Sequence, residues 1–180
     1  FDMFQPDRKH GVHLYCKRVF IMDDCQELMP EYFRFVKGVV DAPDLNLNVS
    51  REILQQDYLV RNIRRNLVKK LFDLLNGMDQ EPYEKFWQEF GAVLKVGVHT
   101  DIENKNKIAD LLRYKTTKSD GQWKSLQQYV KDMPPDQKEI YYITGENLSA
   151  LINSPLLEQL KSKNFEVLLM TDPIDEWVTQ

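Results

Sequence analysis

This sequence has few cysteines, no long apolar run and no marked excess of charge of one sign. No apolar run approaches the ~20 residues that a membrane-spanning helix needs, and no segment resembles a signal peptide. The formal net charge is -4 over 180 residues, which argues against a dedicated nucleic-acid binder because such proteins carry a marked basic excess. We therefore expect a cytoplasmic protein that binds neither membranes nor nucleic acids.

Cysteine occurs only as Cys16 and Cys25, so a disulfide framework is not expected in a chain of this length. Both lie among apolar residues, which predicts free, buried thiols in a reducing compartment. His10, His13 and Cys16 follow one another at intervals of three, a pattern that invites a zinc site. On a strand, this odd spacing sends successive side chains to opposite faces, so we predict no metal site.

Nucleotide-binding motifs are absent as well. Neither Gly-x-Gly-x-x-Gly nor a Walker sequence occurs, and there is no internal repeat, low-complexity tract or Ser/Gly-rich linker. The composition, 42% hydrophobic and 29% charged, is sufficient for a packed core. The chain opens with Phe-Asp-Met-Phe and stops soon after an acidic turn, and we expect it to be a piece of a longer protein.

Apolar spacing predicts a mixed α/β chain with divisions near Asp57 and His99. In the first part we predict a strand over 13–22 and a stretch over 32–40 that begins helical and becomes a strand. Asn and Pro residues mark 41–56 as an irregular loop.

Two amphipathic helices follow and form a helical connector. The first covers 58–76, with leucine or isoleucine at every fourth position and Gly77 as its C-terminal cap. The second begins after Pro82 and ends at Gly97. Its aromatic stripe, 83–90, is expected to be core rather than a partner groove.

The first connector helix also carries a basic face. We expect this face to be solvated; attraction for an acidic partner or for nucleotide phosphates is the alternative. Its residues are Arg61, Arg64, Arg65, Lys69 and Lys70.

The last part of the chain predicts a small α/β layer. Apolar strands over 140–144 and 165–170 flank helical segments over 148–152 and 155–163. A strand–helix–strand order at this spacing is typical of a βαβ unit, with parallel strands and a right-handed crossover.

Short polar motifs predict further helix starts in that layer. Thr100-Asp101-Ile102-Glu103 is a capping box, and Ser125 with Gln128 forms a second one.

The carboxylates of 172–176 follow a strand end, where α/β enzymes place active sites. Because no histidine or nucleophile lies nearby in sequence, we expect these carboxylates to cap the next helix and not to form a hydrolase site.

The loop over 45–55 is the strongest functional candidate. Its apolar residues can anchor the loop by packing into the core. The polar side chains of Asn48, Ser50, Arg51 and Gln55 then remain free for directed hydrogen bonds. If the segment from Ser50 is helical, Arg51 and Gln55 share one face, and a guanidinium beside an amide suits phosphate oxygens. The alternative is that Ser50 caps a helix and Arg51 pairs with a nearby carboxylate.

At this loop the sequence resembles the ninety-kilodalton heat-shock chaperone family, in its bacterial form. Asn-Val-Ser-Arg-Glu-Ile-Leu-Gln, at 48–55, resembles the catalytic loop of that family's middle domain. Other similar segments occur in order along nearly the whole chain, at 14–15, 18–23, 35–38, 111–114, 140–145 and 165–177.

The resemblance implies part of a dimeric ATPase chaperone that has an N-terminal nucleotide domain, a middle domain and a C-terminal dimerisation domain. The chain would be a middle domain without its first strands. Residues 1–57 would end the larger α/β/α subdomain, 58–98 would be the helical connector, and 99–180 would form the smaller α/β/α subdomain.

The resemblance also implies roles for individual residues. Arg51 would contact the γ-phosphate of ATP once the N-terminal domain docks, Gln55 would assist, and Asn48 and Ser50 would support the loop. ATP and magnesium would be held by the N-terminal domain, so this chain alone would bind neither and would not hydrolyse ATP. Client proteins would bind in part to this chain. A freestanding, helix-rich interaction scaffold without a catalytic role is the alternative function.

Overall fold

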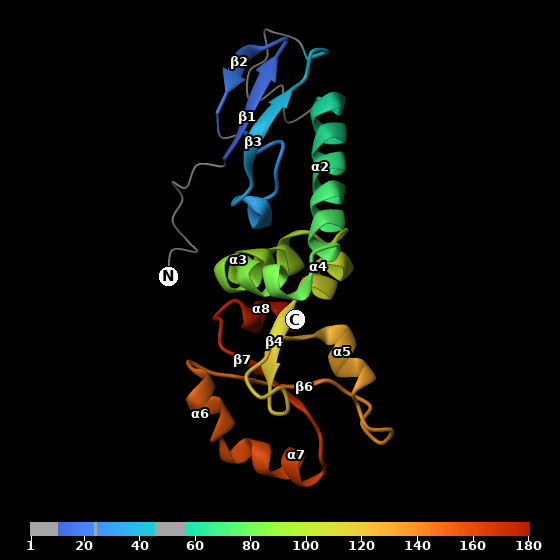
Figure 1. Ribbon diagram of the computed structural model, residues 1–180, viewed down its shortest axis with the longest axis vertical. Coiled ribbons are helices and arrows are strands. Elements are labelled where there is room, and N and C mark those ends of the chain that lie inside the picture. Colours follow the sequence, from blue (N-terminus) through green and yellow to red (C-terminus); the bar gives the residue numbers. More distant parts are fainter. Residues whose placement is uncertain (1–10, 24, 46–56) are drawn as a thin grey trace. The chain divides into compact units, whose positions relative to one another are not determined.

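The computed structural model describes residues 11–23, 25–45 and 57–180 (Figure 1). The chain divides into two compact units, Phe1–Met78 and Asp79–Gln180. Each unit contains both helices and a β-sheet, which confirms the mixed α/β class. The division falls between the two helices of the predicted connector, and the three-part scheme with a separate connector stays a prediction.

The first unit contains a three-stranded sheet in the order β2-β1-β3. Strand β1 (Gly11–Cys16) lies in the centre, antiparallel to β2 (Val19–Met22) and parallel to β3 (Lys37–Asp41). One face of β1 is buried and the other is partly exposed, the alternation expected of a strand with one face on the core. His13 and Cys16 lie on opposite faces, as the argument against a zinc site required.

The prediction of one strand over 13–22 is wrong, because the chain reverses in the middle. Lys17 and Arg18 both have left-handed backbone conformations, with φ of 51° and 66°, and they form the turn of a hairpin. This conformation normally calls for glycine or asparagine, so the sequence carries no signal for it. The Asp41 carboxylate accepts a hydrogen bond from the Arg18 N–H at 3.1 Å and supports the turn.

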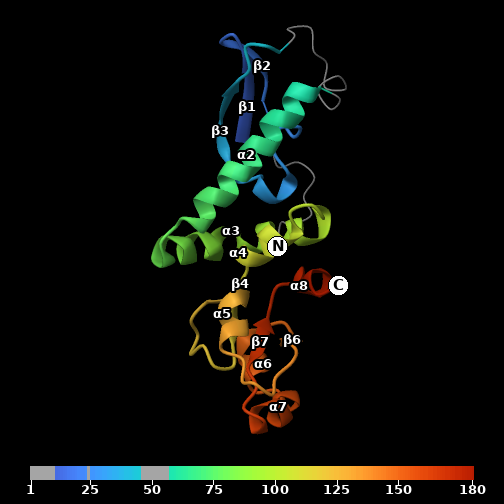
Figure 2. The same ribbon diagram turned by 90° about the vertical axis from the view of Figure 1, so that its right-hand side faces the viewer.

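Helix α2 covers Tyr58–Asn76, the span that the sequence predicts, and Gly77 caps it by donating its N–H to the carbonyl of Asp73 at 3.0 Å. It lies beside the sheet in both views (Figures 1 and 2). Phe72 packs against two rings at the short 3₁₀ helix η1 (Glu31–Phe33), Phe33 at 5.3 Å and Tyr32 at 6.4 Å between centroids. The predicted helical start of 32–40 is confirmed here, and the strand that follows it is β3.

The second unit begins with α3 (Gln80–Thr100) and α4 (Lys105–Leu111). Two predictions at their junction are wrong: α3 continues through Gly97, and Thr100 does not open a capping box. The Thr100 hydroxyl instead donates back to the carbonyl of Val96 at 3.1 Å, a bond that β-hydroxyl residues readily make within a helix.

A four-stranded sheet in the order β5-β4-β7-β6 forms the centre of the second unit. Strands β4 (Arg113–Thr116) and β5 (Lys124–Ser125) are absent from the sequence-based prediction, because both are short and polar. Helix α5 (Leu126–Lys131) begins after Ser125, whose hydroxyl oxygen accepts the N–H of Gln128 at 3.1 Å as predicted.

The predicted βαβ unit is confirmed in its strand direction. Strands β6 (Tyr141–Thr144) and β7 (Val167–Met170) are parallel and adjacent. Between them lie α6 (Leu148–Ile152), η2 (Pro155–Leu157) and α7 (Glu158–Ser162). Apolar side chains from this crossover pack onto β7, with Leu151, Leu157, Val167 and Leu169 fully buried. A final helix, α8 (Asp175–Val178), follows β7.

Candidate functional site

The loop residues singled out from the sequence, Asn48, Ser50, Arg51 and Gln55, lie outside the described residues. Their predicted roles therefore stay predictions. The structure does describe the residues on both sides of this segment, from Ala42 to Leu45 and from Asp57 onward.

The chain that enters the loop is bonded to the central strand. The Ala42 N–H donates to the carbonyl of Tyr15 at 2.9 Å, and Leu45 is buried with its N–H donated to Ala42 at 3.0 Å. The Cys16 thiol, which has no exposed surface, donates to the carbonyl of Leu45 at 3.1 Å. The sequence predicts that Cys16 is a free, buried thiol, and this is confirmed. In addition, Cys16 binds the backbone at the residue where the loop begins.

The chain that leaves the loop is fixed by a helix cap. The Asp57 carboxylate accepts the N–H of Leu59 at 2.7 Å and that of Val60 at 3.4 Å, and so closes the first turn of α2. Further along α2, the Arg64 guanidinium donates to the carbonyls of Gln26 and Glu27 at 3.3 and 3.4 Å. These bonds tie the helix that carries the loop's end to the segment after β2.

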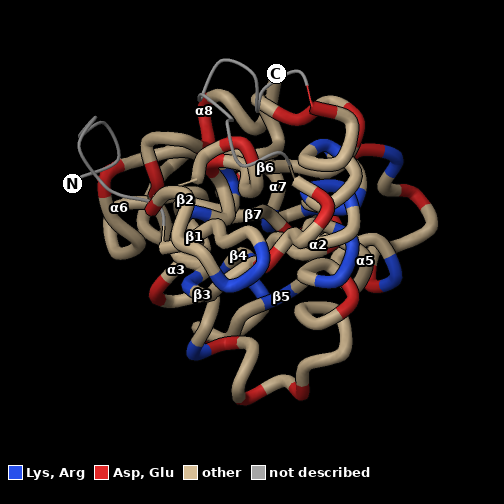
Figure 3. Tube along the Cα trace, turned by 90° about the horizontal axis from the view of Figure 1, so that it is seen from above, with Lys and Arg blue, Asp and Glu red and all other residues tan. Residues whose placement is uncertain are grey.

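The basic face of α2 is solvated, as predicted, at four of its five positions. Arg64 is half-buried, whereas Arg61, Arg65, Lys69 and Lys70 are exposed. Lys and Arg residues recur along this helix in blue in Figure 3. The first unit therefore presents a positive surface on the helix that follows the loop.

The Cys25 thiol is kept in its protonated form. Burial, with the nearby Glu27 carboxylate, raises the pKa of the Cys25 thiol to about 11, so it remains protonated near neutral pH. Among the described residues, no group of three His, Cys, Asp or Glu side chains is placed to hold a metal ion. In the same part of the chain, no helix is long and apolar enough to cross a membrane.

The aromatic stripe of α3 is core at its main positions, as expected. Tyr83 and Trp87 are buried, and Phe90 is partly exposed. The Tyr83 hydroxyl donates to the carbonyl of Leu111, and burial raises its pKa to about 12. Tyr83 and Trp87 are therefore part of the core of their own unit, whereas Phe90 lies at the surface.

The prediction that the carboxylates of 172–176 cap a helix is wrong. No side-chain oxygen caps α8; instead Asp172 and Asp175 both bind the ammonium of Lys95, at 2.8 and 2.7 Å. The Tyr114 hydroxyl donates to Asp175 at 3.0 Å. Burial raises the pKa of Asp175, an effect that Lys95 opposes. Lys95 comes from α3, so sequence spacing could not reveal this cluster.

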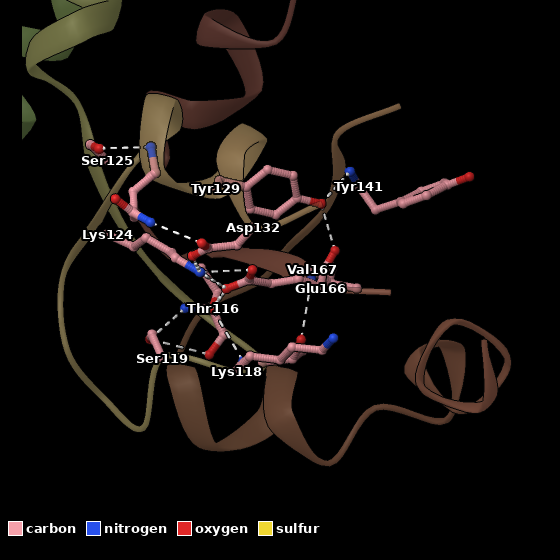
Figure 4. Close-up of polar contacts among 12 residues, drawn as sticks. Thr116, Lys118, Ser119, Lys124, Ser125, Tyr129, Asp132, Tyr141, Glu166 and Val167 are labelled. Atoms are coloured by element: carbon pink, nitrogen blue, oxygen red, sulfur yellow. Dashed lines mark hydrogen bonds and ion pairs between the residues drawn. The ribbon is translucent and has the colours of Figure 1, made fainter. Parts of the chain in front are cut away.

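A second buried polar network joins β4, β5, α5 and β7 (Figure 4). Glu166, only 3% exposed, binds both the ammonium of Lys124 at 2.8 Å and the hydroxyl of Thr116. Lys124 also pairs with Asp132 at 2.7 Å. Burial lowers the pKa of Lys124, but its bonds to Asp132 and Glu166 outweigh this and raise the pKa overall.

Tyr129 completes that network by extending the β6–β7 ladder. Its buried hydroxyl accepts the N–H of Tyr141 at 3.1 Å and donates to the carbonyl of Glu166 at 2.6 Å (Figure 4). The hydroxyl therefore bridges two backbone groups at the point where the parallel strands begin. Burial raises the pKa of this phenol, which keeps it protonated and able to donate.

Comparison with known proteins gives a consistent result. A family model described as Hsp90 protein matches residues 1–180. Chaperone protein HtpG of Geobacter sulfurreducens is 52% identical over 184 residues, covering 100% of this chain and 28% of that protein. HtpG of Nocardia farcinica is 54% identical over 183 residues, covering 99% and 28%.

A solved structure agrees with these sequence matches. The middle domain of a heat shock protein of Plasmodium falciparum superposes with a TM-score of 0.81 at 35% identity, covering 96% of this chain and 68% of that one. The chain spans about 28% of the length of the curated relatives it matches. With the family model matched from end to end and the middle-domain fold in common, the chain belongs to the Hsp90 family.

Proposed function

We propose that this chain is the middle part of an ATP-dependent molecular chaperone, and that Arg51 acts on the γ-phosphate of ATP held by the same protein's N-terminal domain. The main support is the family match, which spans residues 1–180 and so includes the loop over 45–55. The structure describes hydrogen bonds on both sides of the loop, from the Cys16 thiol to the Leu45 carbonyl and from the Leu59 N–H to the Asp57 carboxylate.

The chemistry of Arg51 suits this role. A guanidinium carries a permanent charge and five N–H donors in a planar fork, which matches phosphate oxygens. An arginine delivered to a transferring phosphoryl group from another domain accelerates reaction by about 10³–10⁵-fold in known systems. Gln55 would add an amide donor, and Asn48 and Ser50 would hold the loop in shape.

The nucleotide and magnesium ligands would lie in the N-terminal domain, as would the group that activates water. Because the arginine arrives only when the two domains meet, hydrolysis would be coupled to closure. This chain alone would therefore be inactive.

The remaining parts of the proposal concern the whole protein. The curated relatives are named chaperones, which supports client proteins as partners of the longer protein. We propose a homodimer formed through a C-terminal domain, a cytoplasmic location, and a contribution of this chain to client binding.

The test is ATP turnover of a longer protein that joins this chain to its N-terminal domain. Arg51→Ala is expected to lower kcat by about 10³-fold or more, because the charge on the γ-phosphate loses its partner. Arg65→Ala, which removes the same charge from an exposed site on α2, serves as the matched control.

Two further measurements complete the test. Arg51→Lys retains the charge without the fork and should recover only part of the rate. The 180-residue chain by itself should show no turnover. Unchanged turnover in Arg51→Ala would show that Arg51 has no catalytic role.

A further inference from the structure

Helix α8 is attached to the second unit mainly through the charge of Asp175. It has four residues, far too few to be stable alone, and Asp175 is its only buried residue. Trp177 is half-exposed and touches α3 through the ring of His99, at 5.4 Å between centroids. The attachment of α8 therefore depends mainly on what holds the Asp175 carboxylate.

That carboxylate is held by Lys95, which is itself enclosed. Lys95 is only 3% exposed, and its ammonium lies 4.5 Å from the ring centroid of Tyr114 and 5.8 Å from that of Trp87. Asp172 and Asp175 provide its charged partners. An ammonium with two carboxylates and two aromatic faces is well compensated, and loss of Lys95 would leave the buried Asp175 carboxylate without a charged partner.

The neighbouring crossover is attached in the opposite way. Helix α6 and the turn η2 bind β7 through the buried apolar side chains Leu151 and Leu157. Loss of a charge elsewhere leaves those contacts intact. The two attachments can therefore fail independently.

We propose that Lys95 is a latch that holds α8 onto α3, so that α8 opens as a unit of its own while the sheet of the second unit stays folded. Opening would turn Trp177 away from His99 and free the chain that follows β7. This opening of α8 does not depend on the role of Arg51.

Hydrogen exchange of single amides in the 180-residue chain tests the latch. The N–H groups of Trp177 and Val178 bond to the carbonyl of Ile174, and that of Thr179 bonds to Asp175, so their exchange reports opening of α8. Lys95→Met, which keeps the length of the side chain, should accelerate exchange of these amides by about 100-fold or more.

Lys124→Met is the matched control, because it removes the same charge from a lysine that also binds two carboxylates in the same unit. It should accelerate exchange in β7 and leave the amides of α8 nearly unchanged. Lys95→Met should therefore accelerate exchange in α8 and not in β7, and Lys124→Met should do the reverse. Equal acceleration of α8 and β7 in Lys95→Met, or no change in α8, would overturn it.

A milder variant covers the case in which Lys95→Met does not fold. Asp172 has a side chain that is 35% exposed, and Asp172→Asn removes one of the two charged partners of Lys95. Exchange in α8 should then rise by roughly 3–10-fold with β7 unaffected. An α8 that exchanges as in the unaltered chain would also reject the latch.

Discussion

The two units of this chain are stabilised by different kinds of core. No charged side chain is buried among the residues described in the first unit, where the most polar buried groups are the Tyr32 phenol and the thiols of Cys16 and Cys25. The second unit buries Lys95, Thr116, Gln137, Glu166 and Asp175 in addition to its apolar side chains. In the first unit, apolar packing holds a sheet against one long helix. In the second unit, buried polar groups hold several short elements in position relative to one another.

This difference follows from the lengths of the helices and strands that each unit packs together. A 19-residue helix offers a continuous apolar face, and apolar packing tolerates modest changes in shape. The second unit also has a long helix, the 21-residue α3, but it must join strands as short as two residues and helices as short as four, which offer little apolar area each. Directed bonds between buried charges give such pieces fixed positions, at the cost of a large penalty when one partner is lost.

The largest expected effect comes from breaking that polar core. Lys124→Met leaves the buried Glu166 carboxylate with only the Thr116 hydroxyl and should lower the free energy of unfolding of the second unit by about 3–5 kcal/mol. Denaturant unfolding of the second unit measures it. Leu14→Met, in the first unit, should cost less than about 1.5 kcal/mol because the volume is conserved.

A double variant decides whether charge is the cause. Lys124→Met combined with Glu166→Gln removes both charges while Thr116 keeps an acceptor, so much of the lost stability should return. If the two changes simply add, Lys124 contributes by packing and the contrast between the two cores is wrong.

Much of the fold can be predicted from the sequence where its pattern is long. Helix α2 has the predicted bounds, and the parallel pairing of β6 with β7 follows from spacing between two apolar strands. Strand β5 has two residues and is too short to show a period of any kind. The turn at Lys17 could not be predicted for a different reason. The left-handed backbone there comes from the pairing of the strands on either side.

The polar clusters could not be predicted, because their members are distant in sequence. Lys95 is 77 residues from Asp172, and Lys124 is 42 residues from Glu166. In sequence, Asp172 has the form of a helix cap, and only the fold shows that its carboxylate turns to Lys95. The loop over 45–55 is the reverse case: its motif is local and resembles that of a family, and residues 46–56 lie outside the described residues.

A smaller effect is expected from the hydroxyl that extends the β6–β7 ladder. Tyr129→Phe removes the bridge between the Tyr141 N–H and the Glu166 carbonyl and should lower stability by about 1–3 kcal/mol, because both groups are left unbonded. Exchange of the Tyr141 amide should accelerate together with the loss. Tyr142→Phe, on an exposed side chain of the same strand, should change neither quantity.

The smallest expected effect is a difference in stability between variants at the N-terminal caps of α2 and α3. Asp57 and Asp79 both precede a long helix, but only Asp57 bonds its carboxylate to the helix's first N–H groups. Asp57→Ala should therefore cost about 1 kcal/mol, and Asp79→Ala should cost only a few tenths, from the loss of a charge near a helix N-terminus. Thermal unfolding of both variants at low and high salt distinguishes the terms, because only the charge effect is screened. An equal loss in the two variants would mean that the bonds of the Asp57 carboxylate do not stabilise the start of α2.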